Sequence, residues 1–257
     1  MDALRPLWPL TLMLTCAALA SAPAATQPSP DARCQIGDVL YADDFQSDSG
    51  RWISELEKGG SVTFGGGQLD INVPAGATVW FKPELAGPVL IQYAATVVKA
   101  GGPNDRVSDL NCFWMARDSR NPADLFAVKR SGKFADYNPL LTYYVGLGGN
   151  GNTTTRFRRY VGDPVVRPLL PEHDLRDKAD MILPNVSQLI QLIADGNTIE
   201  YFRDGRRLFN YDDAHAYTSG WFGFRTTQNH MQIRHFRVFA VRSSSPTTRP
   251  GAGAVAH

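Results

Sequence analysis

Arginine, tyrosine, tryptophan and amide side chains alternate with apolar residues along several short segments of this chain. In residues 155–160, for example, Arg156 and Arg158 flank the apolar Phe157. Because successive side chains of a β-strand point to opposite faces, each polar set is expected to share one face of a sheet. The residues that we assign to this polar face are Trp80, Lys82, Tyr144, Asn150, Arg156, Arg158, Tyr160, Trp221 and Arg225.

This polar face has the composition of a groove for acidic sugars. Aromatic rings cover the apolar side of a pyranose, and arginine binds a carboxylate through two parallel hydrogen bonds. Gly146 and Gly148 would leave room for a ring between those side chains. A solvated sheet face made of ordinary strand-forming residues is the structural alternative.

A polysaccharide lyase is the first enzyme class that such a groove suggests. β-Elimination beside a uronic acid needs a group that neutralises the carboxylate, a base and an acid. Clustered cations are expected to lower the pKa of Tyr144. We assign the roles as follows: Arg158 and Asn150 neutralise, Tyr144 or His173 is the base, Tyr144 is the acid, Lys82 and Arg130 are flanking cations, and Trp80 is a stacking platform.

Two other functions compete with the lyase interpretation. A lectin-like carbohydrate-binding module would use the same aromatic and arginine side chains without turnover, so it is the alternative. A glycoside hydrolase needs two carboxylates across the groove, and the available pairs are Glu55 with Glu57 and Asp105 with Asp109. Because the polar face is rich in arginine, the hydrolase ranks third.

No cofactor is expected from the sequence. Asn104, Asp105, Asp109 and Asn111 bring oxygen ligands together as a structural calcium site would, but their spacing matches no recognised calcium loop. A structural turn is therefore the favoured interpretation of this segment, and calcium is the alternative.

The apolar residues recur with a period of two, and no segment keeps a helical stripe for three turns. Asp204-Gly205 predicts a tight hairpin turn. The pattern predicts an all-β fold, a jelly-roll sandwich of two antiparallel sheets, whose long connections at 119–140 and 161–184 belong to the site. The predicted strands are 39–45, 61–64, 68–73, 78–82, 89–98, 110–116, 142–147, 155–160, 187–194, 198–203, 206–212, 220–226 and 231–241.

The N-terminal segment of the chain indicates export. Residues 1–24 have the basic start, apolar run and small-residue cleavage sites of a signal peptide, which predicts a secreted or periplasmic protein. We expect a flexible linker at 25–37, one domain at 38–242 and a disordered tail at 243–257. An oxidising compartment would permit a disulfide between Cys34 and Cys112, although a buried free thiol at Cys112 is equally compatible.

The charge of the chain is balanced, with 26 basic and 25 acidic residues and a net charge of +1. This balance argues against nucleic-acid binding through bulk charge. No second apolar stretch follows the signal, so no membrane insertion is expected after cleavage. The expected partner is a polysaccharide or oligosaccharide, and the oligomeric state stays open.

Several of these segments occur together in a known bacterial family. The Arg130-Ser131-Gly132-Lys133 loop, the segment 143–160 and the Gly223-Phe224-Arg225 strand resemble the YesU type of concanavalin-A-like jelly rolls. The resemblance covers residues 40–241. It implies a fold shared with glucanases, lectins and lyases, and a context of pectin or rhamnogalacturonan breakdown. Fold alone does not imply the reaction.

Overall fold

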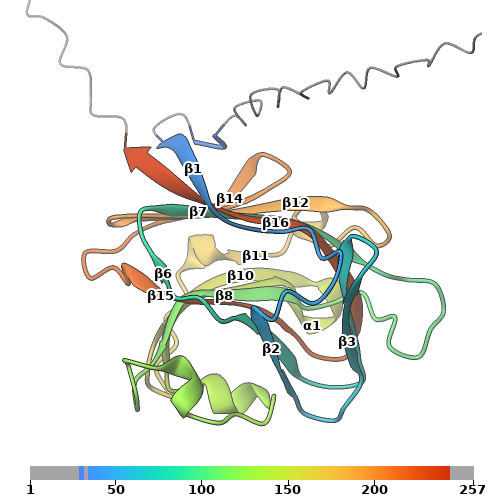
Figure 1. Ribbon diagram of the computed structural model, residues 1–257. Helices are drawn as coiled ribbons and strands as arrows, with labels where there is room; N and C mark the ends of the chain where they lie inside the picture. The colour runs from blue at the N-terminus through green and yellow to red at the C-terminus, as the bar shows by residue number, and fades with distance from the viewer. Residues whose placement is uncertain (1–28, 32–33, 244–257) are drawn as a thin grey trace, which may run out of the picture.

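The structure is a computed structural model that describes residues 29–31 and 34–243. Its strands form two antiparallel sheets of eight strands each, which pack face to face as a jelly-roll sandwich (Figure 1). The predicted fold class is therefore confirmed. The predicted signal peptide, residues 25–28 and 32–33 of the predicted linker, and nearly all of the tail lie outside the described residues.

The first sheet, sheet A, has the strand order β14-β13-β12-β7-β16-β4-β3, with β1 paired to β16. Its strands are β1 (Cys34–Asp43), β3 (Ser61–Gly65), β4 (Gln68–Val73), β7 (Val89–Val97), β12 (Gln188–Asp195), β13 (Thr198–Arg203), β14 (Arg206–Asp212) and β16 (Asn229–Ser243). Since β1 begins at Cys34, the last residues of the predicted linker belong to the sandwich.

The second sheet, sheet B, has the order β11-β10-β9-β8-β15-β5-β2, with β6 paired to β15. Its strands are β2 (Trp52–Leu56), β5 (Ala77–Phe81), β6 (Leu85–Ala86), β8 (Leu110–Asp118), β9 (Leu140–Gly148), β10 (Thr154–Val161), β11 (Asp174–Leu175) and β15 (Ser219–Thr226). All the predicted strands are confirmed, whereas β2, β6 and β11 were not predicted.

The core between the sheets holds the apolar half of each alternating strand. Val79, Tyr143, Val145 and Phe157 are almost fully buried in this core. Trp80, Tyr144 and Tyr160, which alternation assigns to the other face of the same strands, belong to a second cluster on the outer face of sheet B. The predicted division of these strands into two faces is therefore confirmed.

The connection between β8 and β9 covers part of the outer face of sheet B. It carries two short 3₁₀ helices, η1 (Leu125–Ala127) and η2 (Phe134–Tyr137), which lie below sheet B in Figure 1. Tyr137 stacks on Phe113 of β8 with ring centroids 5.5 Å apart. The segment thus converts a sheet face that would otherwise meet solvent into a second apolar layer.

Arg130 anchors this covering segment to the sheet. Its fully buried guanidinium forms ion pairs with Glu55 at 3.0 Å and with Asp118 at 3.1 Å, and it donates to the Leu125 carbonyl. Glu55 also accepts hydrogen bonds from Trp80 Nε1 and from the Tyr137 hydroxyl. A buried cation with so many partners holds the segment in one position.

The two cysteines that follow the predicted signal form no disulfide with each other. Cys34 and Cys112 are both buried, and Cys112 is a free thiol. Burial raises the pKa of the Cys112 thiol to about 12. Of the two alternatives left open by the sequence, the buried free thiol at Cys112 is therefore the one observed. Within residues 29–31 and 34–243, no helix has the length and apolarity needed to cross a membrane.

Candidate functional site

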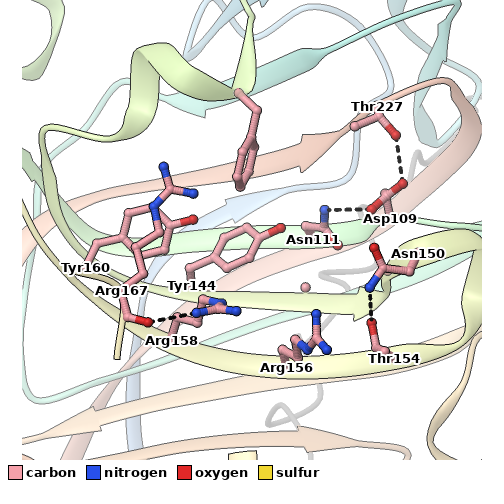
Figure 2. Close-up of a pocket in the computed structure, with 13 residues that line it drawn as sticks. Asp109, Asn111, Tyr144, Asn150, Thr154, Arg156, Arg158, Tyr160, Arg167 and Thr227 are labelled. Carbon is pink, nitrogen blue, oxygen red and sulfur yellow. Dashed lines mark hydrogen bonds between the residues drawn. The ribbon is translucent and has the colours of Figure 1, made fainter. Parts of the chain in front are cut away.

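A cavity of about 320 Å³ opens on the outer face of sheet B, beside the covering segment. Its walls come from β8, β9 and β10, from the turn α1 (Gly149–Asn152), from the connection that precedes β8, and from those that follow β8, β10 and β15 (Figure 2). The lining residues are Asp109, Asn111, Phe134, Tyr144, Gly146, Gly149, Asn150, Thr154, Arg156, Arg158, Tyr160, Arg167 and Thr227.

Strand register places the lining side chains in rows across the sheet. Asn111 of β8 lies opposite Gly146 of β9, and Gly146 lies opposite Arg156 of β10. In the next outward-facing row, Tyr144 of β9 lies opposite Arg158. The sequence spacing of two therefore produces this wall, because residues two apart on a strand share a face.

Three arginines form the cationic part of the cavity. Arg156 is bound by Asp174 at 2.7 Å and 3.2 Å, and its hydrogen bond lowers the pKa of that carboxyl. Arg158 donates to the Arg167 carbonyl, and the Arg167 guanidinium lies 5.2 Å from the Tyr160 ring. Among the described residues, neither Arg158 nor Arg167 forms an ion pair with a carboxylate. The cavity therefore contains two positive charges that no carboxylate of the described chain contacts.

Oxygen and amide groups form the opposite end of the cavity in Figure 2. Asp109 accepts hydrogen bonds from Thr227 at 2.7 Å and, more weakly, from the Asn111 amide at 3.5 Å. Asn150, in the turn α1, donates to Thr154 at 3.2 Å. A ligand in this cavity would therefore meet Arg158 and Arg167 at one end, and hydroxyl-binding groups together with the aspartate-bound Arg156 at the other.

Tyr144 lies between the two ends, flat against β9. A side-chain carbon at Gly146 would come within 3.2 Å of its hydroxyl, so the absence of that carbon gives the phenol its place. Burial raises the pKa of Tyr144 well above its ordinary value, although the charge of Arg225 opposes this rise. The expectation that clustered cations lower this pKa is wrong, because desolvation outweighs them.

Four predicted site residues lie under the covering segment and do not line the cavity. Trp80 is fully buried, so neither face of its ring can stack on a sugar. Arg130 forms ion pairs with Glu55 and Asp118. The Trp221 indole donates a hydrogen bond to the Lys82 carbonyl. Arg225 is 1% exposed and donates to the Gly132 carbonyl. Each of these side chains stabilises the covering segment or its contact with the sheet.

Lys82 and His173 also lie away from the cavity. Lys82 donates through Nζ to the Gly50 carbonyl at 2.7 Å. His173 is 4% exposed, and its ring contacts Phe157 and Phe209 of the core between the sheets. Burial lowers the pKa of His173. It therefore does not fit the role of base, since β10 separates it from the face that carries Arg158.

The candidate carboxylate pairs and the candidate calcium ligands have structural partners. Glu57 accepts from the Gly76 amide, as Glu55 does from Trp80 and Tyr137. Asp105 accepts from two backbone amides of its own turn, and Asn104 donates to the side chain of Asn72. Within the described chain, no group of three or more His, Cys, Asp or Glu side chains is arranged to hold a metal ion.

Sequence reasoning missed Phe134, Arg167 and Thr227. The first two come from the long connections that were expected to belong to a site, but no periodic pattern indicates which of their residues point inward. Thr227 follows β15 directly. Its hydroxyl reaches Asp109 only because β15 and β8 are neighbours in sheet B.

The fold and the cavity together define a jelly-roll sandwich with a polar site on one outer sheet face. A family model, described as domain of unknown function DUF6250, matches residues 71–236. Because this match spans more than half of the chain, the chain belongs to the DUF6250 family. Every residue that lines the cavity lies within the matched region. A sequence search of curated proteins finds no match.

Solved structures share the fold at low sequence identity. A Bacillus subtilis protein of unknown function with a galectin-like fold has a TM-score of 0.63 at 18% identity, covering 81% of this chain and 98% of its own. The carbohydrate-binding module CBM66 from B. subtilis has a TM-score of 0.52 at 10% identity, covering 76% and 99%. β-Agarase A from Zobellia galactanivorans has a TM-score of 0.52 at 11% identity, covering 84% and 96%.

Proposed function

We propose that the protein binds an acidic saccharide in this cavity, with a uronate carboxylate held by Arg158 and Arg167. The observation that carries the proposal is a difference between the arginines of β10 in their ion pairs. Arg156 and Arg159 are each paired with an aspartate, whereas no described carboxylate contacts Arg158. Since an unpaired guanidinium in a partly desolvated site favours an anionic ligand, a carboxylate is the expected partner.

Aromatic groups and size support a sugar as the rest of this ligand. Phe134, Tyr144 and Tyr160 line the same cavity as the arginines. Its volume of about 320 Å³ equals that of about ten water molecules, which is the scale of a single sugar unit. The sandwich neighbours include a carbohydrate-binding module and an agarase, and these support carbohydrate as the ligand class.

A polysaccharide lyase is the second candidate, and the position of Tyr144 favours it. Tyr144 lines the same cavity as Arg158 and stays protonated at neutral pH, so its hydroxyl could donate to the leaving oxygen. The catalytic base is the weaker part of the lyase hypothesis, because Asp109 is the only carboxylate among the described lining residues and it is already bound by Thr227. Binding therefore ranks first, lyase second and hydrolase, which needs two facing carboxylates, third.

The biological setting follows from the sequence. We propose a secreted or periplasmic protein, kinship with the YesU type of jelly roll, and a role beside the breakdown of pectin or rhamnogalacturonan. Neither nucleic acid nor a cofactor is part of the proposal.

A panel of polysaccharides tests the order of the candidates. Wild-type protein and the Tyr144→Phe variant are incubated with pectate, rhamnogalacturonan, glucuronan and neutral galactan. Binding is measured by calorimetry, and unsaturated uronate by its ultraviolet absorbance. Binding of an acidic member without absorbance supports a binding protein, and absorbance that Tyr144→Phe abolishes supports the lyase. Binding only to galactan, or to no member, would contradict the proposal.

A further inference from the structure

Two polar atoms of the cavity wall, one donor and one acceptor, have no hydrogen-bond partner among the described residues. The donor is the buried Nε of Arg167, at the end that also carries Arg158. The acceptor is the buried Oδ1 of Asn111, at the other end. Buried polar atoms are nearly always paired in native proteins, so each such atom at a cavity wall requires an explanation.

Asp109 fixes the orientation of the Asn111 amide. The Asn111 Nδ2 group faces Asp109 Oδ1 at 3.5 Å. A carboxylate only accepts hydrogen bonds, so the reversed amide would bring two oxygens together. Asp109 is itself held by Thr227, by Ser108 and by an ion pair with Arg106 at 3.3 Å. The Asn111 oxygen is therefore presented by a network that the protein has already built.

The Asn111 oxygen lies at the wall of the cavity. Asn111 is 3% exposed and lines the cavity. Its neighbour on β9 is Gly146, which has no side chain of its own and over which the Tyr144 phenol lies. A buried acceptor that lines a cavity and that no described group donates to fits a donor that a ligand supplies.

We infer that Asn111 is a specificity-determining residue whose amide oxygen accepts a hydrogen bond from a hydroxyl group of the bound saccharide. This inference rests on the proposed function and deepens it. Arg158 and Arg167 bind the carboxylate at one end of the cavity, and the Asn111 oxygen accepts a hydrogen bond from a hydroxyl group at the other end. The site therefore selects a hexuronate unit with a free secondary hydroxyl on the side of the ring away from its carboxylate.

The inference is tested with methyl glucuronoside, methyl galacturonoside and their 2-O-methyl and 3-O-methyl derivatives. Affinities are measured by calorimetry for wild type, Asn111→Leu and the control Asn210→Leu, which alters an exposed residue of sheet A. Wild type should lose roughly 5- to 150-fold in affinity when one hydroxyl is methylated. Asn111→Leu should bind the parent sugar as weakly as wild type binds that derivative, and should no longer distinguish the two.

Thermal unfolding without saccharide separates this role from a structural one. Leucine has the same number and branching of side-chain heavy atoms as asparagine and removes the buried oxygen, so Asn111→Leu should unfold at the same temperature as wild type or higher. If Asn111 instead stabilised the fold, its replacement by leucine would lower the unfolding temperature. Asn111→Ser is measured beside it, because a smaller polar residue avoids any misfit of leucine.

The outcomes distinguish this inference from the proposed function. If wild type binds the parent sugars and Arg158→Gln abolishes binding, but Asn111→Leu keeps full affinity and selectivity, the role of Asn111 is wrong and the acidic site stands. A marked loss of thermal stability in both Asn111 variants would also overturn it. If wild type binds neither these sugars nor acidic polysaccharides, the proposed function fails and the inference fails with it.

Discussion

Gly146 keeps the cavity open, because its missing side chain leaves space for both the Tyr144 phenol and a ligand. Its backbone has an ordinary φ, so alanine is tolerated by the main chain. In Gly146→Ala the new methyl group would meet the Tyr144 ring at 3.2 Å and push it into the cavity. We expect affinity for oligogalacturonate to fall by about tenfold, with the free energy of unfolding changed by less than about 1 kcal/mol.

Gly65→Ala is the matched control for this variant, since nothing lies within 4 Å of that position and its φ is also ordinary. Calorimetry gives the affinity, and urea denaturation gives the stability. Unchanged affinity in Gly146→Ala would show that the ligand does not occupy the space beside Tyr144.

For single residues, the sequence predicts which face of the sheet a side chain points to better than it predicts how far that side chain is buried. Alternation placed Tyr144, Arg156 and Arg158 on one face, as observed. It could not give the pKa of Tyr144, because desolvation depends on neighbours from other elements. Asn111 carries a signal, since it is a polar residue inside the apolar strand β8, but the sequence favours a structural turn for its segment and offers calcium only as the alternative.

The covering segment between β8 and β9 depends on one buried cation. Arg130→Met removes the charge, keeps a long side chain, and leaves Glu55 and Asp118 without their buried partner. Breaking such a pair on one side should lower the free energy of unfolding by about 3–5 kcal/mol. Urea denaturation followed by tryptophan fluorescence measures this, since the Arg130 guanidinium lies 5.7 Å from the Trp80 ring.

The exposed neighbour Lys129 supplies the control, and Lys129→Met should change stability by less than about 0.5 kcal/mol. A loss below about 1 kcal/mol in Arg130→Met would mean that the apolar contacts of Tyr137 and Leu125 hold the segment without the ion pairs.

A strand can be predicted from the sequence where its apolar and polar residues form a clear pattern. Strands such as β4 alternate clearly and β7 is a long apolar run, and both patterns predict a strand. The edge strand β2 exposes Ile53 and Ser54 and carries little pattern, and β11 has only two residues. The packing of the covering segment over Trp80 depends on contacts between distant residues, so burial of Trp80, Trp221 and Arg225 could not be predicted from their own strands.

For the molecule as a whole, buried tyrosines predict sensitivity to alkali. Burial raises the pKa of Tyr93, Tyr144 and Tyr201 well above the ordinary value. Below pH ~10 both the native and unfolded states keep these protons, so the stability is fully present. Above pH ~10 only the unfolded state releases them, and stability should fall by about 1.4 kcal/mol per pH unit for each buried tyrosine.

Tyrosinate absorbance and circular dichroism, recorded together during an alkaline titration, check this expectation. The buried tyrosines should ionise in the same transition that unfolds the protein. Full ionisation of all tyrosines near pH ~10 with the sandwich intact would contradict it.

The central claim is that the cavity binds a carboxylate through Arg158. Calorimetric titration of wild type and Arg158→Gln with oligogalacturonate and with its carboxyl-reduced counterpart tests it most directly, and Arg51→Gln, an exposed arginine outside the cavity, is the control. Wild type and Arg51→Gln should prefer the acidic sugar by roughly 10- to 150-fold, and Arg158→Gln should lose that preference. An equal preference in wild type and Arg158→Gln would contradict the account.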